Sequence, residues 1–93
     1  MPLYVDQPVW QWRGRQWAHL ISDRSFDDLH HAARALQIPE RAFDGDHYDI
    51  PQERWADVVA YGARPVSSRE IVRLLTAAGL RRPKGRPRAA GRG

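Results

Sequence analysis

The side chains that could carry chemistry in this 93-residue chain are its scattered aspartates and histidines. Asp6 directly follows the short apolar run 3–5, which is typical of a strand. Because ligands of open α/β sheets bind at the carboxyl ends of strands, Asp6 stands where a metal-binding or catalytic carboxylate is expected. The residues that could gather around it are Asp23, Asp49, His19, His30 and His47.

Such a cluster would suit a divalent ion that activates water for phosphodiester hydrolysis. His47 and Asp49 alternate along a strand-like run, so they project from the same face. No spacing among these residues forms a recognised metal motif, and most scattered His and Asp residues serve as caps, turns or hydrogen-bond partners. We therefore expect no metal and no other cofactor. A metal-dependent nuclease or phosphodiesterase centred on Asp6, with Asp23, His47 and Asp49, is kept as an alternative.

The second distinctive feature is an arm, residues 81–93, with six positive charges and no negative charge. Residues 1–80 contain nine arginines against all eleven acids, so this part of the chain is weakly acidic. A weakly acidic domain with a basic arm predicts a polyanionic partner, most simply nucleic acid. The arm is also made of the residues that GC-rich codons encode, so an inert solubilising tail is the competing interpretation.

Within the arm, residues 83–88 resemble the AT-hook, a short peptide that binds the minor groove of A/T-rich DNA. Gly85 lets the backbone sit on the groove floor, and Pro87 keeps the chain extended. Arg86 can then lie along the groove, where narrow A-tracts concentrate negative potential. The side chains expected to contact phosphates are Lys84, Arg88, Arg81 and Arg82.

The elements that must position these residues follow from periodicity and from capping patterns. We expect strands at 3–5, 19–22 and 47–50. Ser25 with Asp28, and Ser67 with Glu70, have the spacing of capping boxes that open a first and a third helix. A second helix follows Pro51. This order predicts one small α/β domain over residues 1–80, with three helices on a short sheet, followed by a disordered arm.

The second and third helices could instead form a helix-turn-helix, since a short link at 62–67 joins them. Arg69 and Arg73 would then face DNA and continue into Arg81 and Arg82 as one positive strip. The link is longer than the usual tight turn, and Glu70 is poorly placed for an anionic groove. Two ordinary amphipathic helices of an α/β domain are the favoured interpretation.

Tryptophans and arginines alternate between Trp10 and Trp17, in a segment that we expect to be a loop. Indoles of this kind usually belong to the core or its edge. If they are exposed beside arginines, they could stack on bases or form a protein-binding hot spot.

Several short strings together resemble a family of short bacterial and phage proteins, common in actinobacteria and their phages and catalogued as a domain of unknown function. The strings are Tyr4-Val5-Asp6, Trp17 with His19-Leu20, Ser22-Asp23, Leu29-His30, His47-Tyr48-Asp49 and Pro65-Val66-Ser67-Ser68-Arg69-Glu70. The resemblance covers residues 3–80 and implies a small cytoplasmic α/β domain. The start Tyr4-Val5-Asp6 also resembles PIN-type nucleases, in which acids at strand ends bind divalent ions.

The chain has no cysteine and no apolar run long enough for a membrane span, so we expect a cytoplasmic protein that does not contact membranes. The leading hypothesis is a DNA-binding protein, regulatory or nucleoid-associated rather than catalytic, that uses the arm and the third helix. The alternatives are the metal-dependent phosphodiesterase and a phage or bacterial protein that binds and inhibits a host protein.

Overall fold

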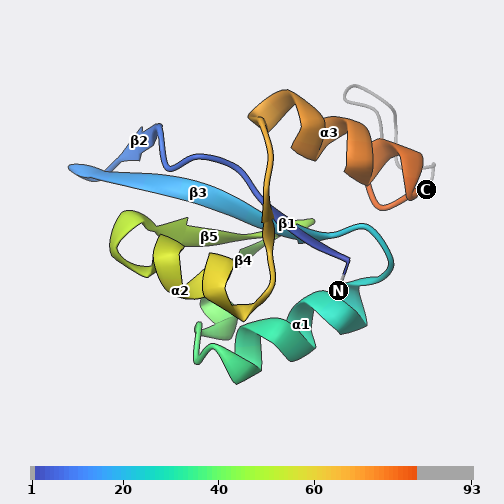
Figure 1. The fold of residues 1–93 in the computed structure, drawn as a ribbon, viewed down its shortest axis with the longest axis horizontal. Helices are drawn as coiled ribbons and strands as arrows, with labels where there is room; N and C mark the ends of the chain where they lie inside the picture. Colours follow the sequence, from blue (N-terminus) through green and yellow to red (C-terminus); the bar gives the residue numbers. More distant parts are fainter. Residues whose placement is uncertain (1, 82–93) are drawn as a thin grey trace, which may run out of the picture.

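The computed structural model describes residues 2–81, which form a six-stranded sheet with helices on both faces (Figure 1). The strands are β1 (Leu3–Val5), β2 (Trp10–Trp12), β3 (Arg15–Ser22), β4 (Phe43–Asp44), β5 (His47–Pro51) and β6 (Arg64–Pro65). The helices are α1 (Phe26–Ala35), α2 (Trp55–Tyr61) and α3 (Ser68–Ala77), with the 3-10 turns η1 (Glu40–Ala42) and η2 (Gln52–Arg54). The expected α/β domain with three helices is confirmed for this part of the chain.

The long strand β3 organises the sheet, whose order is β4-β5-β3-β1-β6, with β2 paired to the first residues of β3. All pairs are antiparallel except β1 with β6, which is parallel. On one side of β3, Leu20 lies opposite Val5 of β1, and on the other side His19 lies opposite Asp49 of β5. The end of β1 therefore meets the middle of β3 and β5 at the centre of the sheet.

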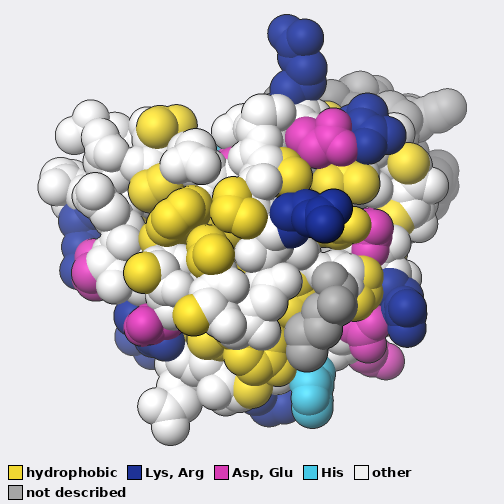
Figure 2. All heavy atoms as spheres, viewed as in Figure 1, with side chains coloured by type: hydrophobic (Ala, Val, Ile, Leu, Met, Phe, Trp, Pro, Cys, Tyr) yellow, Lys and Arg dark blue, Asp and Glu magenta, His cyan; other side chains and the backbone are white. Residues whose placement is uncertain are grey.

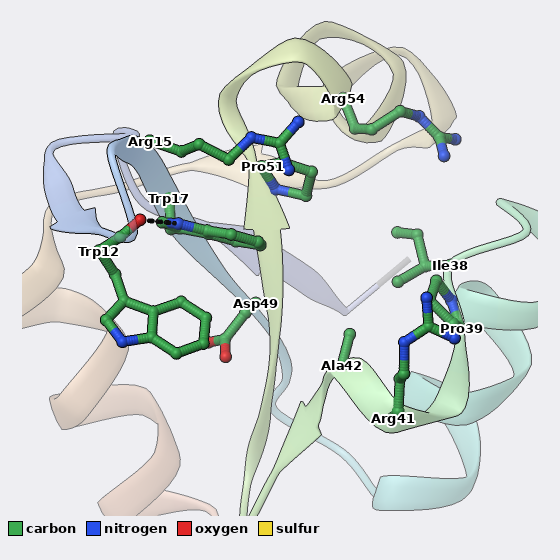
Figure 3. Close-up of a pocket in the computed structure, with 10 residues that line it drawn as sticks. All are labelled: Trp12, Arg15, Trp17, Ile38, Pro39, Arg41, Ala42, Asp49, Pro51 and Arg54. Carbon is green, nitrogen blue, oxygen red and sulfur yellow. Dashed lines mark hydrogen bonds between the residues drawn. The ribbon is translucent and has the colours of Figure 1, made fainter.

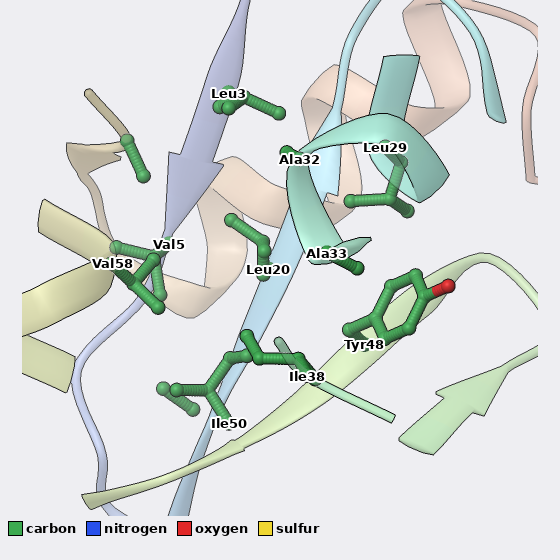
Figure 4. Close-up of a cluster of buried hydrophobic side chains, with 12 residues drawn as sticks. Leu3, Val5, Leu20, Leu29, Ala32, Ala33, Ile38, Tyr48, Ile50 and Val58 are labelled. Atoms are coloured by element: carbon green, nitrogen blue, oxygen red, sulfur yellow. The ribbon is translucent and has the colours of Figure 1, made fainter. Parts of the chain in front are cut away.

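Alternation along the strands gives the sheet two different faces. One face, with Leu20, Tyr48 and Ile50, is buried against α1 and α2 in the main hydrophobic core (Figure 4). The opposite face carries a smaller cluster, in which Ile21 packs against Ile71 and Leu75 of α3. Because α3 covers only part of this second face, the side chains next to Ile21 along β3 can be polar.

The helix starts follow the predicted capping boxes. The Ser25 hydroxyl accepts a hydrogen bond from the Asp28 amide at 3.1 Å, and the Ser67 hydroxyl accepts one from the Glu70 amide at 3.1 Å. Each such cap stabilises its helix by about 1 kcal/mol. The cap on Ser67 also fixes the position of Ser68, the first residue of α3.

The helix-turn-helix alternative is wrong, because α2 and α3 pack on opposite faces of the sheet (Figure 1). Val58 of α2 belongs to the main core, whereas Ile71 and Leu75 of α3 belong to the smaller cluster. The link between the helices contains β6, which pairs with β1 and carries the chain past the edge of the sheet. The parallel pairing of β6 thus separates two helices that are neighbours in the sequence.

The tryptophan-rich segment 10–17 is a hairpin rather than the expected loop. Trp10 pairs with Trp17, and Trp12 pairs with Arg15. Arg13 and Gly14 form the turn with φ values of 54° and 73°, the left-handed conformations that a tight two-residue hairpin requires. Trp10 and Trp12 keep 38 % and 47 % of their surface exposed. The indoles therefore stand on a defined strand with their rings open to solvent.

The surface of the described domain mixes both signs of charge, and Figure 2 shows basic and acidic side chains interspersed on one face. Five arginines form ion pairs with acids, namely Arg15, Arg24, Arg54, Arg73 and Arg81. Within residues 2–81, none of the helices has the length and apolar character that a membrane span needs.

Candidate metal centre

The candidate site lies on the α3 side of the sheet, where His19 of β3 and Asp49 of β5 are paired across the strands. His47 stands two residues before Asp49, so both side chains project from the same face. Each of these three residues offers one ligand atom, and the three atoms lie within 4.8 Å of one another. His19, His47 and Asp49 form the one group of His, Asp or Glu side chains in residues 2–81 that could share a metal ion.

A carboxylate holds each imidazole through its Nδ1 atom. His19 Nδ1 lies 2.7 Å from Asp6 Oδ2, and His47 Nδ1 lies 2.7 Å from Asp46 Oδ1. A neutral ring in this position carries its proton on Nδ1 and donates it to the carboxylate, which leaves a lone pair on Nε2. Carboxylates orient metal-binding histidines in proteins in the same way. Both rings are thus prepared to offer Nε2 to a cation.

The contact between His47 and Asp49 has the spacing of two ligands on one ion. His47 Nε2 lies 3.1 Å from Asp49 Oδ1, and this oxygen is buried without a hydrogen-bond partner among the described residues. When the His47 ring is neutral with its proton on Nδ1 toward Asp46, two lone pairs face each other here, whereas a doubly protonated ring donates to both carboxylates. Two ligands bound to one zinc ion at about 2.0–2.1 Å stand about 2.8–3.4 Å apart. A cation would turn this unfavourable contact into a favourable one.

Burial raises the pKa of the Asp49 carboxyl, and the neighbouring His47 opposes that rise. A carboxyl that is costly to ionise in the empty site would be stabilised in its charged form by a bound cation. Charge balance points the same way. Asp6, Asp46 and Asp49 are three carboxylates in or beside the cluster, and among residues 2–81 Arg81 is the one guanidinium that bonds to them, through Asp46 at 2.7 Å. With all three carboxylates ionised and both imidazoles neutral, the negative charge that remains matches a divalent ion.

Asp6, the residue predicted to bind metal, is instead the support of His19. Its side chain is 1 % exposed, and its carboxylate accepts hydrogen bonds from the His19 amide at 2.6 Å and from the Ser68 hydroxyl at 2.8 Å. Burial raises the pKa of Asp6, but the hydrogen bonds from His19 and Ser68 outweigh it, and the pKa is lowered. In the structure Asp6 therefore stands beside the group of potential ligands and supports His19, and it is not a member of that group.

The network around Asp6 ties three distant segments to the site. The Trp55 indole of α2 donates to the Asp6 carbonyl at 2.8 Å, and Ser68 reaches the carboxylate from the start of α3. On the open side, the Trp10 ring stacks on the His19 ring with 5.1 Å between centroids. The hydrogen bond to Asp6 raises the pKa of His19 even though burial opposes the rise. His19 is therefore held from both sides in one orientation.

Two residues predicted for the cluster lie elsewhere. Asp23 follows β3 and stands beside Tyr4, whose pKa is raised by burial and by the Asp23 carboxylate. His30 is on α1 at the other face of the sheet, where its Nδ1 lies 2.6 Å from the Tyr48 hydroxyl. Neither belongs to the group of potential ligands. The expectation that all the acids and histidines converge was wrong for these two, because Asp23 lies beyond the end of β3 and His30 lies on a helix that packs on the opposite face of the sheet.

The residues predicted to contact DNA are only partly described. Arg69 and Arg73 are exposed on α3, and Arg73 is hydrogen-bonded to Glu70 of the same helix. Arg81 is bound to Asp46, the carboxylate that holds His47 in the candidate site. The other predicted contacts, Arg82, Lys84, Gly85, Arg86, Pro87 and Arg88, lie outside the described residues.

Asp46 and Ser68 are functional candidates that the sequence reasoning missed. The sequence assigned neither residue to the site, yet Asp46 holds the His47 ring and Ser68 donates to the carboxylate that holds His19. Asp46 directly precedes the His47 strand, and this adjacency was the one available signal for its role. Ser68 had no signal, since 62 residues separate it from Asp6 along the chain.

Comparison with known proteins gives one family match, to the family described as protein of unknown function (DUF4031), over residues 3–78. The chain matches no curated protein and no solved structure.

Proposed function

The chain belongs to the DUF4031 family, and for this member we propose a divalent-metal-dependent phosphodiesterase with His19, His47 and Asp49 as the metal ligands. The observation that carries the proposal is the unpartnered Asp49 Oδ1, 3.1 Å from the Nε2 lone pair of a histidine whose other nitrogen is held by a carboxylate. A cation between the two facing acceptors of the neutral state satisfies both of them, and a metal ion is the cation that this proposal places there.

The ligand set favours a first-row transition ion over Mg²⁺ or Ca²⁺, because imidazole suits Zn²⁺, Fe²⁺ and related ions. Two histidines and one carboxylate leave a coordination position open, as catalytic zinc sites do. An ion held there would supply a bound water of lowered pKa and would polarise a phosphoryl oxygen. The protein's own contribution is to hold both rings by Asp6 and Asp46 and to place Asp49 opposite His19 on the neighbouring strand.

The substrate class follows from the arm. Residues 81–93 carry six positive charges and no negative charge, which attracts polyanions. Arg81, the first residue of this arm, is bound through two hydrogen bonds to Asp46, the carboxylate that orients His47. The arm therefore begins at the metal centre. A polyanion with phosphodiester bonds is the substrate that this arrangement supports.

The proposal is tested by hydrolysis of bis(p-nitrophenyl) phosphate by the full chain with Zn²⁺, Mn²⁺ or Mg²⁺. We expect turnover with Zn²⁺ or Mn²⁺, little with Mg²⁺, and none after EDTA treatment. His19→Ala should abolish the activity, and the matched control His31→Ala, on the exposed surface of α1, should retain it. Metal binding without hydrolysis of this ester or of an oligonucleotide would show that the centre is structural and would contradict the proposal.

DNA binding by the arm remains a prediction, separate from the substrate of the proposed centre. Arg86→Ala combined with Arg88→Ala should weaken binding to an A/T-rich duplex, because both cations are removed from the AT-hook-like sequence. The slope of log K against log salt should become shallower by about 1–2, at roughly 0.9 per lost phosphate contact. Fluorescence anisotropy across a salt series measures both effects.

Arg34→Ala, an exposed arginine on α1, is the control for that measurement. Equal affinity of the full chain for A/T-rich and G/C-rich duplexes would contradict the AT-hook interpretation, although not the metal centre. Capture of a host protein by the tryptophan-rich segment also stays a prediction.

A further inference from the structure

A groove of about 400 Å³ opens beside the metal centre and shares Asp49 with it (Figure 3). Figure 3 shows Trp12 and Trp17 on one side and Arg41 with Ile38 on the other. We call it the tryptophan–arginine groove; its aromatic and charged lining residues are Trp12, Trp17, Arg15, Arg41, Arg54 and Asp49. The volume lies within the range of small-ligand sites.

The fold creates this groove by leaving one strand edge uncovered. The short β4 pairs only with His47 and Tyr48 of β5, so the edge from Asp49 to Pro51 has no neighbouring strand. The hairpin of β2 and β3 flanks this edge on one side, and η1 flanks it on the other. The uncovered edge of β5, with the hairpin on one side and η1 on the other, therefore forms a concave surface next to Asp49, a proposed metal ligand.

The positive charges of the groove are not equally available. Arg15 is paired with Glu53, and Arg54 is bound to Asp57 at 3.0 Å and to the Leu36 carbonyl at 2.7 Å. Arg41 is exposed and forms no ion pair with the other described residues. A guanidinium without a protein partner at the mouth of a groove can bind a phosphate by paired hydrogen bonds.

The two indoles are held rigidly. The Trp17 Nε1 atom donates to the Trp12 carbonyl at 3.0 Å, and the two rings meet edge to face with 5.7 Å between centroids. Trp12 nevertheless keeps 47 % of its surface exposed. An exposed indole beside cations is the element with which proteins bind unpaired bases, since every base has a π face and every nucleotide a phosphate.

We propose that the tryptophan–arginine groove binds one nucleotide of a single-stranded nucleic acid, with its base against Trp12 and Trp17 and its phosphate at Arg41. Asp49 is common to the groove and the metal centre, so a phosphodiester next to the bound nucleotide would reach the ion. Paired bases are stacked within a duplex and do not present their faces to the indoles, so the ligand is single-stranded. The inference rests on the proposed function, because it names the substrate of that centre.

The test compares two labelled ten-residue probes, oligo-dT and an abasic strand with the same backbone, by anisotropy of the full chain in EDTA. The abasic strand keeps every phosphate, so it measures the contribution of the arm and of Arg41 alone. We expect oligo-dT to bind about 5- to 150-fold more tightly, the effect of one stacked base. Trp12→Ala should bring the ratio of the two affinities, oligo-dT over abasic strand, to near 1, a reduction of at least about fivefold.

Arg41→Ala should weaken the binding of both probes. It should also make the slope of log K against log salt shallower by about 0.7, the value for one phosphate contact on a single strand. Arg41 is exposed, so this variant keeps the fold even if Trp12→Ala disturbs the hairpin. Arg34→Ala is the control. Equal affinity of the wild type for the two probes, or an unchanged salt slope for Arg41→Ala, would overturn the inference. The anisotropy assay contains EDTA and no metal, so it measures groove binding independently of hydrolysis. The groove can therefore bind while hydrolysis fails, and hydrolysis can occur while groove binding fails.

Discussion

Asp6→Asn should lower the free energy of unfolding by about 3 kcal/mol, the cost of breaking a buried hydrogen-bonded ion pair. The carboxylate of Asp6 is 1 % exposed and binds the His19 ring, the His19 amide and the Ser68 hydroxyl. For a domain of this size the thermal midpoint should fall by about 12–24 °C. Thermal denaturation in metal-free buffer, followed by circular dichroism, measures the change.

This difference between wild type and variant should itself depend on pH. The bond to Asp6 raises the pKa of His19, so its contribution is full below the ordinary value of 6.5 and is lost as the pH rises through the raised value. Burial raises the pKa of Asp6, but bonds from His19 and Ser68 lower it overall, so its contribution is present above the ordinary value of 3.8 and is lost on acidification. The difference in unfolding free energy between the wild type and Asp6→Asn should therefore be largest between pH 3.8 and pH 6.5.

Asp23→Asn is the matched control, since it makes the same chemical change outside the cluster. Asp23→Asn should lower the free energy of unfolding far less than Asp6→Asn does, and this loss should not vary with pH in the same way. If the two variants were equally stable, the network around Asp6 would not be what holds β1, β3 and α3 together. Asp6→Asn should also weaken metal binding about 10- to 100-fold, the usual effect of losing the carboxylate that orients a histidine ligand.

His47→Ala should reduce zinc affinity by more than about 100-fold, beyond the loss expected from a supporting carboxylate, because it removes a direct ligand. In the wild type, zinc at 100 times its dissociation constant should stabilise the fold by about 2.7 kcal/mol. That gain corresponds to a rise of about 11–22 °C in the thermal midpoint. The rise should disappear in the variant. Isothermal titration with Zn²⁺ and thermal denaturation with and without Zn²⁺ measure the two effects.

His31→Ala, on the exposed surface of α1, removes a histidine without touching the cluster and should bind zinc as the wild type does. This control shows whether removal of any histidine, rather than of His47 in particular, lowers the zinc affinity. Zinc binding that survives His47→Ala unchanged would mean that the ion sits elsewhere, and the assignment of His19, His47 and Asp49 would fall.

Local signals predicted much of the fold. The caps at Ser25 and Ser67 form the expected hydrogen bonds. The strands expected at 3–5, from an apolar run, and at 47–50, from alternation, are present as β1 and β5. These features succeed because each depends on a few adjacent residues. The hairpin at 10–17 was missed because Arg13-Gly14 is not a common turn pair, although Gly14 does adopt a positive φ. The position of α3 was missed because β6 was too short to recognise as a strand.

The site was predicted in part. That His47 and Asp49 share a face followed from their spacing of two, and that Asp6 stands at the end of a strand followed from the apolar run before it. Which aspartate supports a histidine and which could bind the metal could not be predicted from the sequence. These roles depend on which strand lies on each side of β3. With β1 on one side, Asp6 reaches His19 Nδ1, and with β5 on the other, Asp49 lies opposite His19.

The sequence by itself determined the α/β class, the helix starts, the opposite charges of domain and arm, and the side chains available for chemistry. Only the tertiary structure decided that His19, His47 and Asp49 meet, that Asp6 and Asp46 support the rings, and that Arg81 joins the arm to this cluster. The physical reason is the range of the forces involved. Caps and alternation are local, whereas strand register is set by burying Leu20, Tyr48 and Ile50 together, and those residues are distant in the chain.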